Sequence, residues 1–544
     1  MTDKTKVNTP STMDYGTRLS AFSSVLLYGP ILIILTFIVI YVIISTKKIW
    51  QWKQSNIPFL LPIPLIGNKH FLNAYKYVIS IPLNRIYEEN SDKDLVAFFI
   101  TTVPVILLRN PKIIRKICSA NFNKTYMTGF SMSKADLEVQ NTVPFASDLN
   151  LWTEERKFFS PWFQKSSLKD EHFPKFKKLI DRMLRRIMEA KKNGHAVDFK
   201  KITHSFMIEY SSATYFNEDI DTYKEEGALK TFMECFCEES FRRTLNLLLL
   251  TQFPILEALE PFRMIPRKII NPISKLVRRN IDTKDDCVSN ETNFFNHLTS
   301  LVKTSTFDSH KHSDEDDCST NIENDISFKK AVGRAITAGL GTTHTVSILA
   351  LEAIHYLSLH PEYQDRILDE VKEAMEKYGV SEITLQVAKD LKYTEQCLLE
   401  TFRIFPGLPL IMRVCTQDFQ VPGTQYLLKK GDRVIIDTAS IQRDPKNFKN
   451  PNKFDPDRFN PQNIKLIDRD AYVAFGVGPR KCPGQQLGLL IATIYIASLL
   501  SEYELKPHSH QKQVELTDCN PASWHHSIKG ELLVQAIPRK KAAF

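Results

Sequence analysis

A ten-residue loop, FGVGPRKCPG at positions 475–484, constrains what this chain can fold into more than any other segment. It holds three glycines, two prolines and one cysteine, Cys482. An apolar, strand-like stretch (472–475) precedes it and an apolar helical stretch (487–491) follows. Glycine accepts backbone conformations that other residues avoid, and proline fits the first turn of a helix, so we expect a tight loop that leads into a helix. A lone loop thiol is usually inert, so the rest of the chain must show whether Cys482 has a function.

Size and composition bound the classes to which the chain can belong. Its 544 residues suffice for one large domain, or two ordinary ones, with a sizeable core. The net charge of +9 is spread along the chain, which favours an anionic membrane surface or an acidic partner over nucleic acid. The nine cysteines form no CxxC pair, so reduced thiols fit better than a zinc site or a disulfide framework. His310 and His312 lie beside acidic residues, where a solvated loop is favoured over a metal site.

The N-terminal region predicts a membrane anchor. Residues 25–44 run for twenty positions without a charge, which is long enough to span a bilayer. A cleavable signal peptide is the rival interpretation, but the apolar run is long, starts late and has no small-residue cleavage site after it. We therefore expect a short leader (1–24), a transmembrane helix (25–45), a basic, proline-rich hinge (46–68) and one large domain (69–544).

Hydrophobic periodicity predicts a helix-rich domain with a small amount of strand. Residues 95–110 read as strands with a turn at Pro104, and helical patterns dominate from about 112 to 280. A long helix is expected from near residue 325 to just before Pro361.

The middle of that long helix reads TAGLGTT, which is poor helix-forming sequence. Gly339 and Gly341 each cost about 1 kcal/mol relative to alanine. Such a local conflict marks either a functional site or close packing against small residues, and the two interpretations are about equally supported by this segment alone.

A charged pair is expected inside another apolar helix. Glu400 and Arg403 are three residues apart in LLETFRIF, so their side chains lie on one face. Because apolar residues flank them, we expect the pair to be buried, and a buried pair needs further hydrogen-bonding partners. Arg458, in NPNKFDPDRF, is a candidate for that role.

Taken together and in this order, these segments resemble the cytochrome P-450 superfamily of heme-thiolate monooxygenases. FGVGPRKCPG matches the superfamily's heme-binding loop, F-x-x-G-x-R-x-C-x-G, at every fixed position. ETFR matches E-x-x-R, PNKFDPDRF matches P-x-x-F-x-P-x-R-F, AGLGTT resembles A-G-x-[DE]-T-T, and WTEER resembles the W-x-x-x-R of a helix beside the heme. The resemblance covers the chain from the hinge to the C-terminus. It implies the superfamily's fold, a helix-rich triangular prism with small β-sheets, preceded here by the transmembrane helix.

The resemblance also implies roles for individual residues. Cys482 would be the axial thiolate of the heme iron, with Phe475 in the same cofactor-binding loop. Arg480 would meet a heme propionate, and further donors would be Trp152, Arg156 and Arg413. Glu400, Arg403 and Arg458 would form a buried structural network behind the cysteine loop, which serves folding and heme incorporation.

Thr342 takes the position of the superfamily's oxygen-activating threonine, and here the sequence departs from the pattern. The acid that usually precedes this threonine is replaced by Gly341. His344 is no obvious substitute, because on a regular helix it points about 200° away from Thr342. The proton supply therefore has no assigned acid.

The implied activity is insertion of one oxygen atom of O2 into a hydrophobic organic substrate, such as a lipid, a steroid-like compound or a xenobiotic. The cofactor would be heme b. Electrons would come from NADPH through the flavoprotein NADPH-cytochrome P-450 reductase, with cytochrome b5 as a second candidate donor, and no nucleic acid is implied. An apolar pocket is expected to include Ala338, Leu408 and Ile411.

The anchor and the segment VPGTQYLLKKGDRVIIDTASIQRDP resemble the animal, including invertebrate, microsomal branches that oxidise xenobiotics and lipids. This implies an endoplasmic-reticulum membrane protein with one span, a membrane-lipid contact and a cytosolic catalytic domain (69–544). The sequons at Asn123 and Asn290 should then stay unmodified. Two alternatives to a monooxygenase stay open: a heme-thiolate isomerase or dehydratase that needs neither O2 nor a reductase, and a non-catalytic heme sensor or carrier. Consumption of NADPH in the presence of the reductase separates both from a monooxygenase.

Overall fold

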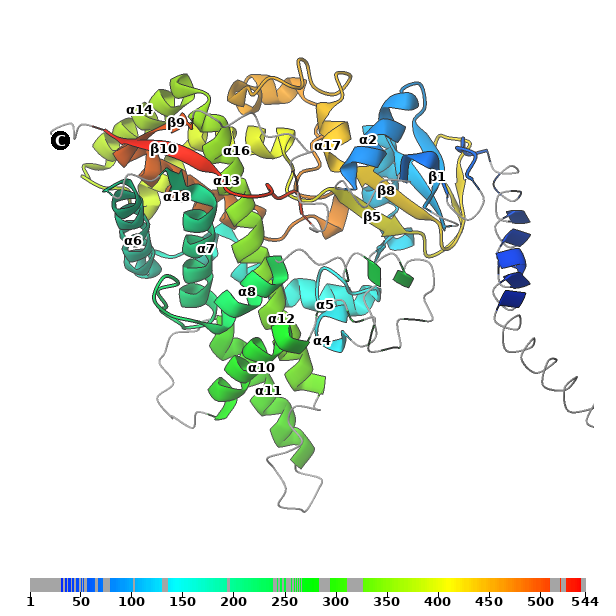
Figure 1. The fold of residues 1–544 in the computed structure, drawn as a ribbon, viewed down its shortest axis with the longest axis horizontal. Helices are drawn as coiled ribbons and strands as arrows, with labels where there is room; N and C mark the ends of the chain where they lie inside the picture. The colour runs from blue at the N-terminus through cyan, green and yellow to red at the C-terminus, as the bar shows by residue number, and fades with distance from the viewer. Residues whose placement is uncertain are drawn as a thin grey trace, which may run out of the picture.

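The computed structural model describes residues 56–63, 67–71, 79–100, 103–129, 136–192, 196–237, 267–282, 294–310, 326–508 and 525–539, with Cys519 and scattered residues of 31–52 and 242–265. Within that part of the chain, helices dominate and strands are few, which confirms the predicted helix-rich fold class with small sheets (Figure 1).

The α-helices follow one another along the chain with short connections. They are α2 (Ser80–Glu89), α3 (Pro111–Arg115), α4 (Leu137–Gln140), α5 (Leu149–Phe159), α6 (Phe173–Lys192), α7 (Phe199–Tyr215), α8 (Ala228–Cys237), α10 (Arg267–Asp282), α11 (Phe294–His310), α12 (Ile326–Gly339), α13 (Thr345–Ser358), α14 (Pro361–Tyr378), α15 (Leu385–Asp390), α16 (Lys392–Ile404), α17 (Thr438–Arg443) and α18 (Gln485–Glu502).

Shorter helical segments of other types join them. Two are π-helical, η3 (Lys116–Ala120) and η11 (Leu340–His344). The 3-10 segments are η1 (Lys69–Phe71), η4 (Phe122–Lys124), η5 (Ser160–Trp162), η6 (Lys165–Ser167), η7 (Asp170–His172), η12 (Pro456–Phe459), η13 (Asn463–Leu466) and η14 (Gly478–Arg480).

The strands form three small sheets. The largest has the order β1 (Leu95–Ile100), β2 (Val103–Leu108), β8 (Arg433–Asp437), β5 (Leu410–Val414), β3 (Met127–Thr128), and only its β2–β8 pair is parallel. The others are β4 (Val197–Asp198), β10 (Leu533–Pro538), β9 (Tyr503–Pro507) and the pair β6 (Phe419–Gln420), β7 (Leu427–Leu428). The five-stranded sheet lies at the right of Figure 1 and the β9–β10 sheet at the upper left, with α13 and α16 between them.

Two helices form the centre of the larger core. From Val346 to Ser358 every residue of α13 is buried, and α18 is apolar on all sides, as expected for a helix surrounded by protein. Among the described residues, 478–502 is the stretch long and apolar enough to cross a membrane, but 67% of its apolar window is buried inside the protein. It is therefore a core helix.

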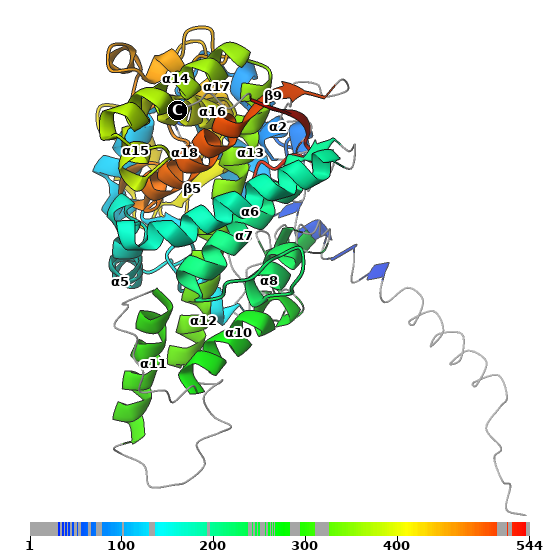
Figure 2. The ribbon, with the colours of Figure 1, turned by 90° about the vertical axis from the view of Figure 1, so that its left-hand side faces the viewer.

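The predicted long helix is present as α12, η11 and α13 in succession, ending three residues before Pro361. It runs through the molecule from its lower end, where α10 and α11 accompany it, to the upper part between the sheets (Figures 1 and 2). The π-helical segment η11 covers LGTTH, the glycine- and threonine-rich centre. A π-turn inserts one residue, so it changes which side chains face a given direction further along the helix.

Two local predictions of secondary structure were wrong. Pro104 is not the turn but the second residue of β2, where it pairs with Phe99 near the start of the strand, a position that proline tolerates. Residues 472–475 form turns and not a strand, because Tyr472 and Phe475 pack against each other and against α16.

The predicted anchor, residues 25–45, lies mostly outside the described residues. Those that are described between 31 and 43 are helical, and the apolar side chains among them are largely exposed, for example Leu32 at 67% and Ile43 at 60%. The described part of the predicted hinge is docked on the protein. The N–H of Leu60 donates to the carbonyl of Ala97 at 2.8 Å, and the N–H of Ala97 donates to Pro58 at 2.7 Å, along the outer edge of β1.

Candidate active site

The loop that carries Cys482 is a tight turn in front of α18. The backbone N–H of Cys482 donates to the carbonyl of Phe475 at 2.7 Å and closes the loop. Gly476 and Gly478 have φ of 84° and 70°, which glycine adopts without strain. A side chain at Gly478 would also collide with a neighbour, since a Cβ there would lie 2.1 Å from the carbonyl oxygen of Cys118. The conformation of the loop therefore requires these two glycines.

The Cys482 thiol is accessible and has hydrogen-bond donors around it. Burial by the surrounding protein raises the pKa of the thiol. The backbone N–H groups of Gly484 and Gln485 hydrogen-bond to the sulfur and, with the Arg156 guanidinium, lower the pKa in part. Donors at a helix N-terminus and a nearby cation stabilise a thiolate.

Helix α5 brings two of the predicted residues, Trp152 and Arg156, to the cysteine loop. The helix begins at Asp148, whose carboxylate accepts the N–H of Leu151 at 2.8 Å. Arg156 Nη1 donates to the carbonyl of Lys481 at 2.7 Å, so α5 is fastened to the residue before the cysteine. Trp152 is buried at the opposite end of the same face.

A second contact fixes α5 to the long helix, and sequence reasoning missed it. Glu155 is fully buried and accepts three hydrogen bonds from Arg334 of α12, the shortest at 2.7 Å. The Arg334 guanidinium also lies 3.8 Å from the ring centre of Phe158. The WTEER segment therefore makes two hydrogen-bonded contacts. Arg156 binds the cysteine loop, and Glu155 binds α12.

Arg413 and Arg480 lie beside the cysteine loop, and neither pairs with a carboxylate among the described residues. Arg413, on β5, donates to the carbonyl of Met412 at 2.8 Å, while Arg480 donates to Ala146 and lies 5.1 Å above the ring of Trp152. The Nε atom of each has no hydrogen-bond partner in that part of the structure. Burial lowers the pKa of both, and with repulsion from Arg413 the pKa of Arg480 falls to about 9. Buried cations are normally paired, so this arrangement suits an anionic ligand.

The predicted structural residues form one buried network. Arg403 donates to both oxygens of Glu400, at 2.7 and 2.9 Å, and both side chains are fully buried. Arg458 Nε and the backbone N–H of Asp455 donate to the same carboxylate at 3.2 and 2.9 Å. The remaining N–H groups of Arg403 reach backbone carbonyls, including that of Gln442 at 2.8 Å. The structure thus brings Glu400, Arg403 and Arg458 together.

Gln442, on α17, is a further member that sequence reasoning missed. Its amide nitrogen donates to the carbonyls of Phe402 and Arg403, each at 3.0 Å, and its oxygen accepts the N–H of Val473 at 2.8 Å. No sequence motif marks it, since it lies between Ile441 and Arg443 without a distinctive spacing. It links the charged network to the segment that leads into the cysteine loop.

Thr342 lies on a packed face of the long helix. Its side chain is only 3% exposed, and its hydroxyl donates to the carbonyl of Ala338 at 2.7 Å. Ser211 of α7 lies 2.9 Å from the hydroxyls of both Thr342 and Thr343. These contacts place Thr342 in the interface between the long helix and α7.

At the centre of the long helix, Gly341 is exposed, and a Cβ built on it would meet nothing within 4 Å. Thr345 is half-buried and its hydroxyl donates to the Gly341 carbonyl at 2.6 Å. The next residue, Val346, lies 3.4 Å from where a Cβ would stand on Gly488, in the first turn of α18. Thr345 is thus partly accessible and directly precedes a residue that packs near the helix that follows Cys482.

The three predicted pocket residues differ in exposure. Leu408, four residues after the end of α16, is 42% exposed. Ala338 is fully buried and Ile411 is 7% exposed. Phe475 packs against the ring of Phe402 at 5.5 Å and supports the cysteine loop from the side of α16.

Comparison with known proteins shows the family. The cytochrome P450 family model matches residues 57–533. This chain belongs to the cytochrome P450 family. Cytochrome P450 6d3 of Musca domestica is 26% identical to this chain over 441 residues, which cover 78% of this chain and 83% of that protein. Cytochrome P450 6B7 of Helicoverpa armigera is 25% identical over 518 residues, covering 94% of this chain and 99% of that protein. Cytochrome P450 6B1 of Papilio polyxenes is 26% identical over 465 residues, covering 85% of this chain and 90% of that protein. The predicted resemblance to animal cytochrome P450s is confirmed.

Cytochrome P450s are monooxygenases that carry heme and receive electrons from NADPH through a reductase, as predicted for this chain. The residues around the cysteine loop fit heme. The thiol is accessible and has donors that favour its thiolate, which suits iron. Arg413 and Arg480 are two cations without acidic partners in the described part, which suits a macrocycle with two propionates.

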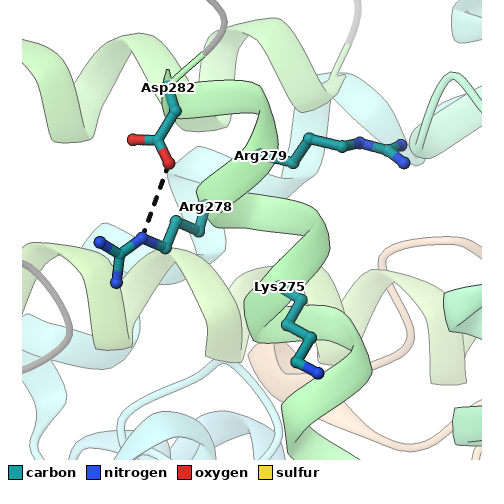
Figure 3. A pocket seen from close by; sticks show the side chains of 4 residues that line it. All are labelled: Lys275, Arg278, Arg279 and Asp282. Atoms are coloured by element: carbon teal, nitrogen blue, oxygen red, sulfur yellow. Dashed lines mark ion pairs between the residues drawn. The ribbon is translucent and has the colours of Figure 1, made fainter.

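A surface hollow of about 430 Å³ also lies on α10, lined by Lys275, Arg278, Arg279 and Asp282. Figure 3 shows the three basic side chains pointing in different directions, with Arg278 paired to Asp282 at 3.6 Å. Arg279 turns away toward Glu218, at 3.4 Å. Because the charges do not converge on one point, this hollow has no features of a ligand site.

Proposed function

We propose that this cytochrome P450 oxidises hydrophobic organic substrates, with Cys482 as the thiolate ligand of heme iron. The observation that carries the proposal is the accessible Cys482 sulfur beside two buried arginines that lack acidic partners among the described residues. Bound heme supplies the reductive activation of dioxygen. Arg413 and Arg480 hold its propionates, and Trp152 and Arg156 complete that side of the cradle.

The residues of the chain hold the thiolate in one position. The Cys482 N–H is tied to Phe475, the two glycines allow the loop to lie close to the macrocycle, and the N–H groups of Gly484 and Gln485 point at the sulfur. Glu400, Arg403 and Arg458 support this loop from behind through Gln442. Their role is heme incorporation and stability, since they do not touch the space that the thiol faces.

The hydroxyl that serves the reaction is that of Thr345. The contacts favour it over the predicted Thr342, because Thr342 is enclosed by Ser211 and Ala338 whereas Thr345 and Gly341 border an accessible space. Among the three predicted pocket residues Leu408 is the exposed one, and an exposed apolar side chain suits a hydrophobic substrate.

The protein is anchored in the endoplasmic-reticulum membrane by residues 25–45, with the catalytic domain in the cytosol and NADPH-cytochrome P-450 reductase as its electron donor. The exposed apolar side chains described between 31 and 43 support an anchor. Among the described residues, Cys118, Cys397, Cys415 and Cys482 form no disulfide, which is in keeping with the cytosol. The net charge of +9 suits an anionic membrane face and an acidic partner.

The central experiment compares the parent protein with Cys482→Ala. Reduced parent protein with CO should show the thiolate Soret band that gives the family its name, and Cys482→Ala should lose it together with NADPH-dependent substrate oxidation. Cys415→Ala, which removes another buried cysteine, is the control and should keep both. A normal thiolate band in Cys482→Ala would refute the assignment.

Topology is tested by glycan analysis of protein made in eukaryotic cells. Asn123 is exposed in η4, so it is available to any glycosylation machinery that meets this face. A glycan on Asn123 or Asn290 would place the domain in the lumen, whereas its absence, with a glycosylated lumenal reporter fused to residue 1 as the positive control, supports the cytosolic orientation.

A further inference from the structure

Three histidines from distant parts of the chain meet beside the centre of the long helix. His344, the last residue of η11, has its ring centre 4.7 Å from that of His525, with the ring planes 75° apart. On the other side the ring of His204, from α7, is 6.3 Å away and perpendicular. His344 directly precedes Thr345, whose hydroxyl borders the proposed oxygen-binding space.

The three differ in exposure in a regular way. His344 is only 6% exposed, while His204 and His525 are each half-buried. A buried imidazole therefore has two partly accessible imidazoles as neighbours. A separation of 6.3 Å between ring centres is a distance that one water molecule bridges, and 4.7 Å is direct contact.

His204, His344 and His525 form a row, and its His525 end is held near Leu408. The ring of His526 lies 2.8 Å from Ser80 Oγ and 2.5 Å from the carbonyl of Pro406, and its backbone N–H donates to Gly407 at 2.9 Å. His525, the preceding residue, is thereby held beside the 406–408 segment, whose Leu408 is exposed.

The outer end lies at Lys200, one turn before His204 on α7. Its ammonium donates to the carbonyls of Ile528 and Gly530, at 2.6 and 2.8 Å, the second of these contacts being at the surface. The row thus runs from a half-buried lysine on α7, with one contact at the surface, to a half-buried histidine next to the segment that precedes Leu408.

Burial keeps all three imidazoles neutral. It lowers the pKa of His204 and His525 to about 4 and that of His344 well below its usual range, and the positive charge of Lys200 acts in the same direction on His204 and His344. A neutral imidazole has one N–H donor and one nitrogen acceptor. It can accept a proton on one nitrogen while releasing one from the other, and so pass protons without storing charge.

We infer that His204, His344 and His525 form a proton relay that replaces the acid missing at Gly341. The inference rests on the proposed monooxygenase function. Each turnover joins one atom of O2 to the substrate and reduces the other to water. The reductase passes on electrons and leaves the NADPH hydrogen in solvent as a proton, so this site itself takes up two electrons and two protons. Both protons enter at the Lys200 end, one after the other, and leave at His525. Each imidazole gains and loses one proton per transfer, so the relay itself is unchanged.

The first test measures coupling, as product formed per NADPH consumed, in parent, His344→Phe and His344→Glu. We expect His344→Phe to form product about 100-fold more slowly and to divert electrons to peroxide, because a positioned proton-transfer group is lost. His344→Glu restores a proton carrier and should recover much of the coupling. His355→Phe removes a buried histidine from the same helix, outside the row, and should behave as parent.

Two further variants separate a relay from packing. Should His344→Phe yield no holoprotein, His525→Phe and His204→Phe, at half-buried positions, address the same step. If the three histidines form a relay, His525→Phe and His204→Phe should each lower coupling and reduce the solvent deuterium isotope effect. The thiolate Soret band should stay intact in both variants. Coupling equal to that of His355→Phe in all these variants would overturn the relay, whereas a missing thiolate band in the parent would overturn the proposed function instead.

A readout independent of turnover is carbethoxylation of the imidazoles, mapped by peptide mass spectrometry. The reagent attacks the unprotonated ring, so an ordinary histidine loses reactivity as pH falls from about 7 to about 5.5. His204 and His525 should react at nearly constant rates over this range, relative to N-acetylhistidine in the same solution, and His344 should be protected. Rates that fall in parallel with the reference would contradict neutral, accessible relay ends.

Discussion

The side-chain oxygen of Gln442 accepts the backbone N–H of Val473 at 2.8 Å, while the same amide donates to two carbonyls at the end of α16. One neutral side chain therefore connects the Glu400–Arg403 network to the start of the cysteine loop. The charged network can influence heme retention through this connection without contacting the heme.

Gln442→Leu should weaken heme retention. The substitution leaves three backbone groups without their partner, and each buried unsatisfied group costs about 1–3 kcal/mol. We expect a lower thermal midpoint and faster heme transfer to apomyoglobin, with the thiolate Soret band unchanged in the protein that retains heme. Gln462→Leu, on the surface, is the control. Equal heme transfer rates in the two variants would show that the Gln442 link is dispensable.

Glu400→Ala or Arg403→Ala should abolish holoprotein and not merely slow the enzyme. Either change leaves a fully buried charge without its partner, at a cost of about 3–5 kcal/mol. Heme content per folded protein is the measurement. Glu395→Ala, on the same helix and paired with Lys392 near the surface, should retain normal heme content. A heme-replete Glu400→Ala protein with reduced turnover would place this residue in the chemistry.

Arg413→Met should have opposite effects on the apoprotein and the holoprotein. Without heme, the guanidinium is buried and has no acidic partner among the described residues, so its removal should raise the unfolding midpoint of the apoprotein. With heme, a propionate loses its cation and heme dissociation should accelerate. Arg115→Met, at an exposed surface pair, should change neither. Destabilisation of the apoprotein by Arg413→Met would mean that its positive charge is compensated by the protein itself.

Thr345→Val and Thr342→Val should differ in coupling. Thr345→Val removes the hydroxyl at the accessible space, and we expect product formation to fall about 100-fold while peroxide rises. It should also shift the infrared C–O stretch of the reduced CO complex, which responds to nearby hydrogen-bond donors. Thr342→Val removes a hydroxyl from the contact with Ser211, so a modest loss of stability is its main expected effect. Loss of coupling in Thr342→Val but not in Thr345→Val would instead assign the reacting hydroxyl to Thr342.

Asp437→Asn should stabilise the protein in a pH-dependent way. Burial raises the pKa of this carboxyl to about 7, and Ser440 is its hydrogen-bond donor. The folded protein therefore binds a proton that the unfolded chain releases near pH 4, and stability falls as pH rises from about 4 to about 7. The asparagine lacks this dependence. Its gain in unfolding midpoint should be largest above pH 7 and vanish near pH 4, and a gain independent of pH would contradict a raised pKa.

Much of this site could be predicted from the sequence because its constraints are local. The helical spacing of Glu400 and Arg403 placed them on one face, and flanking apolar residues indicated burial, as found. The glycines of the cysteine loop signalled positive φ, which Gly476 and Gly478 adopt. In both cases a few neighbouring residues determine the geometry.

The features that could not be predicted from the sequence depend on contacts between distant segments. Gln442 has no local signature, and its role exists only because α17 lies between α16 and the cysteine loop. His344 was expected to point about 200° away from Thr342 on a regular helix, but both residues lie in the π-helical segment η11, where that spacing does not hold. The meeting of His344 with His525 requires the C-terminal segment to pass beside the long helix, which no spacing along the chain encodes.

The pairing of residues 58–60 with β1 has a practical consequence for handling the protein. Strand β1 would otherwise be the open edge of the five-stranded sheet, and an open edge offers free N–H and C=O groups to another molecule. Recombinant versions shortened to remove the membrane segment should therefore begin before Ile57, which is itself buried at 3% exposure. A cut placed after Leu60 would uncover the edge of an apolar strand, and the shortened protein should then self-associate through that edge.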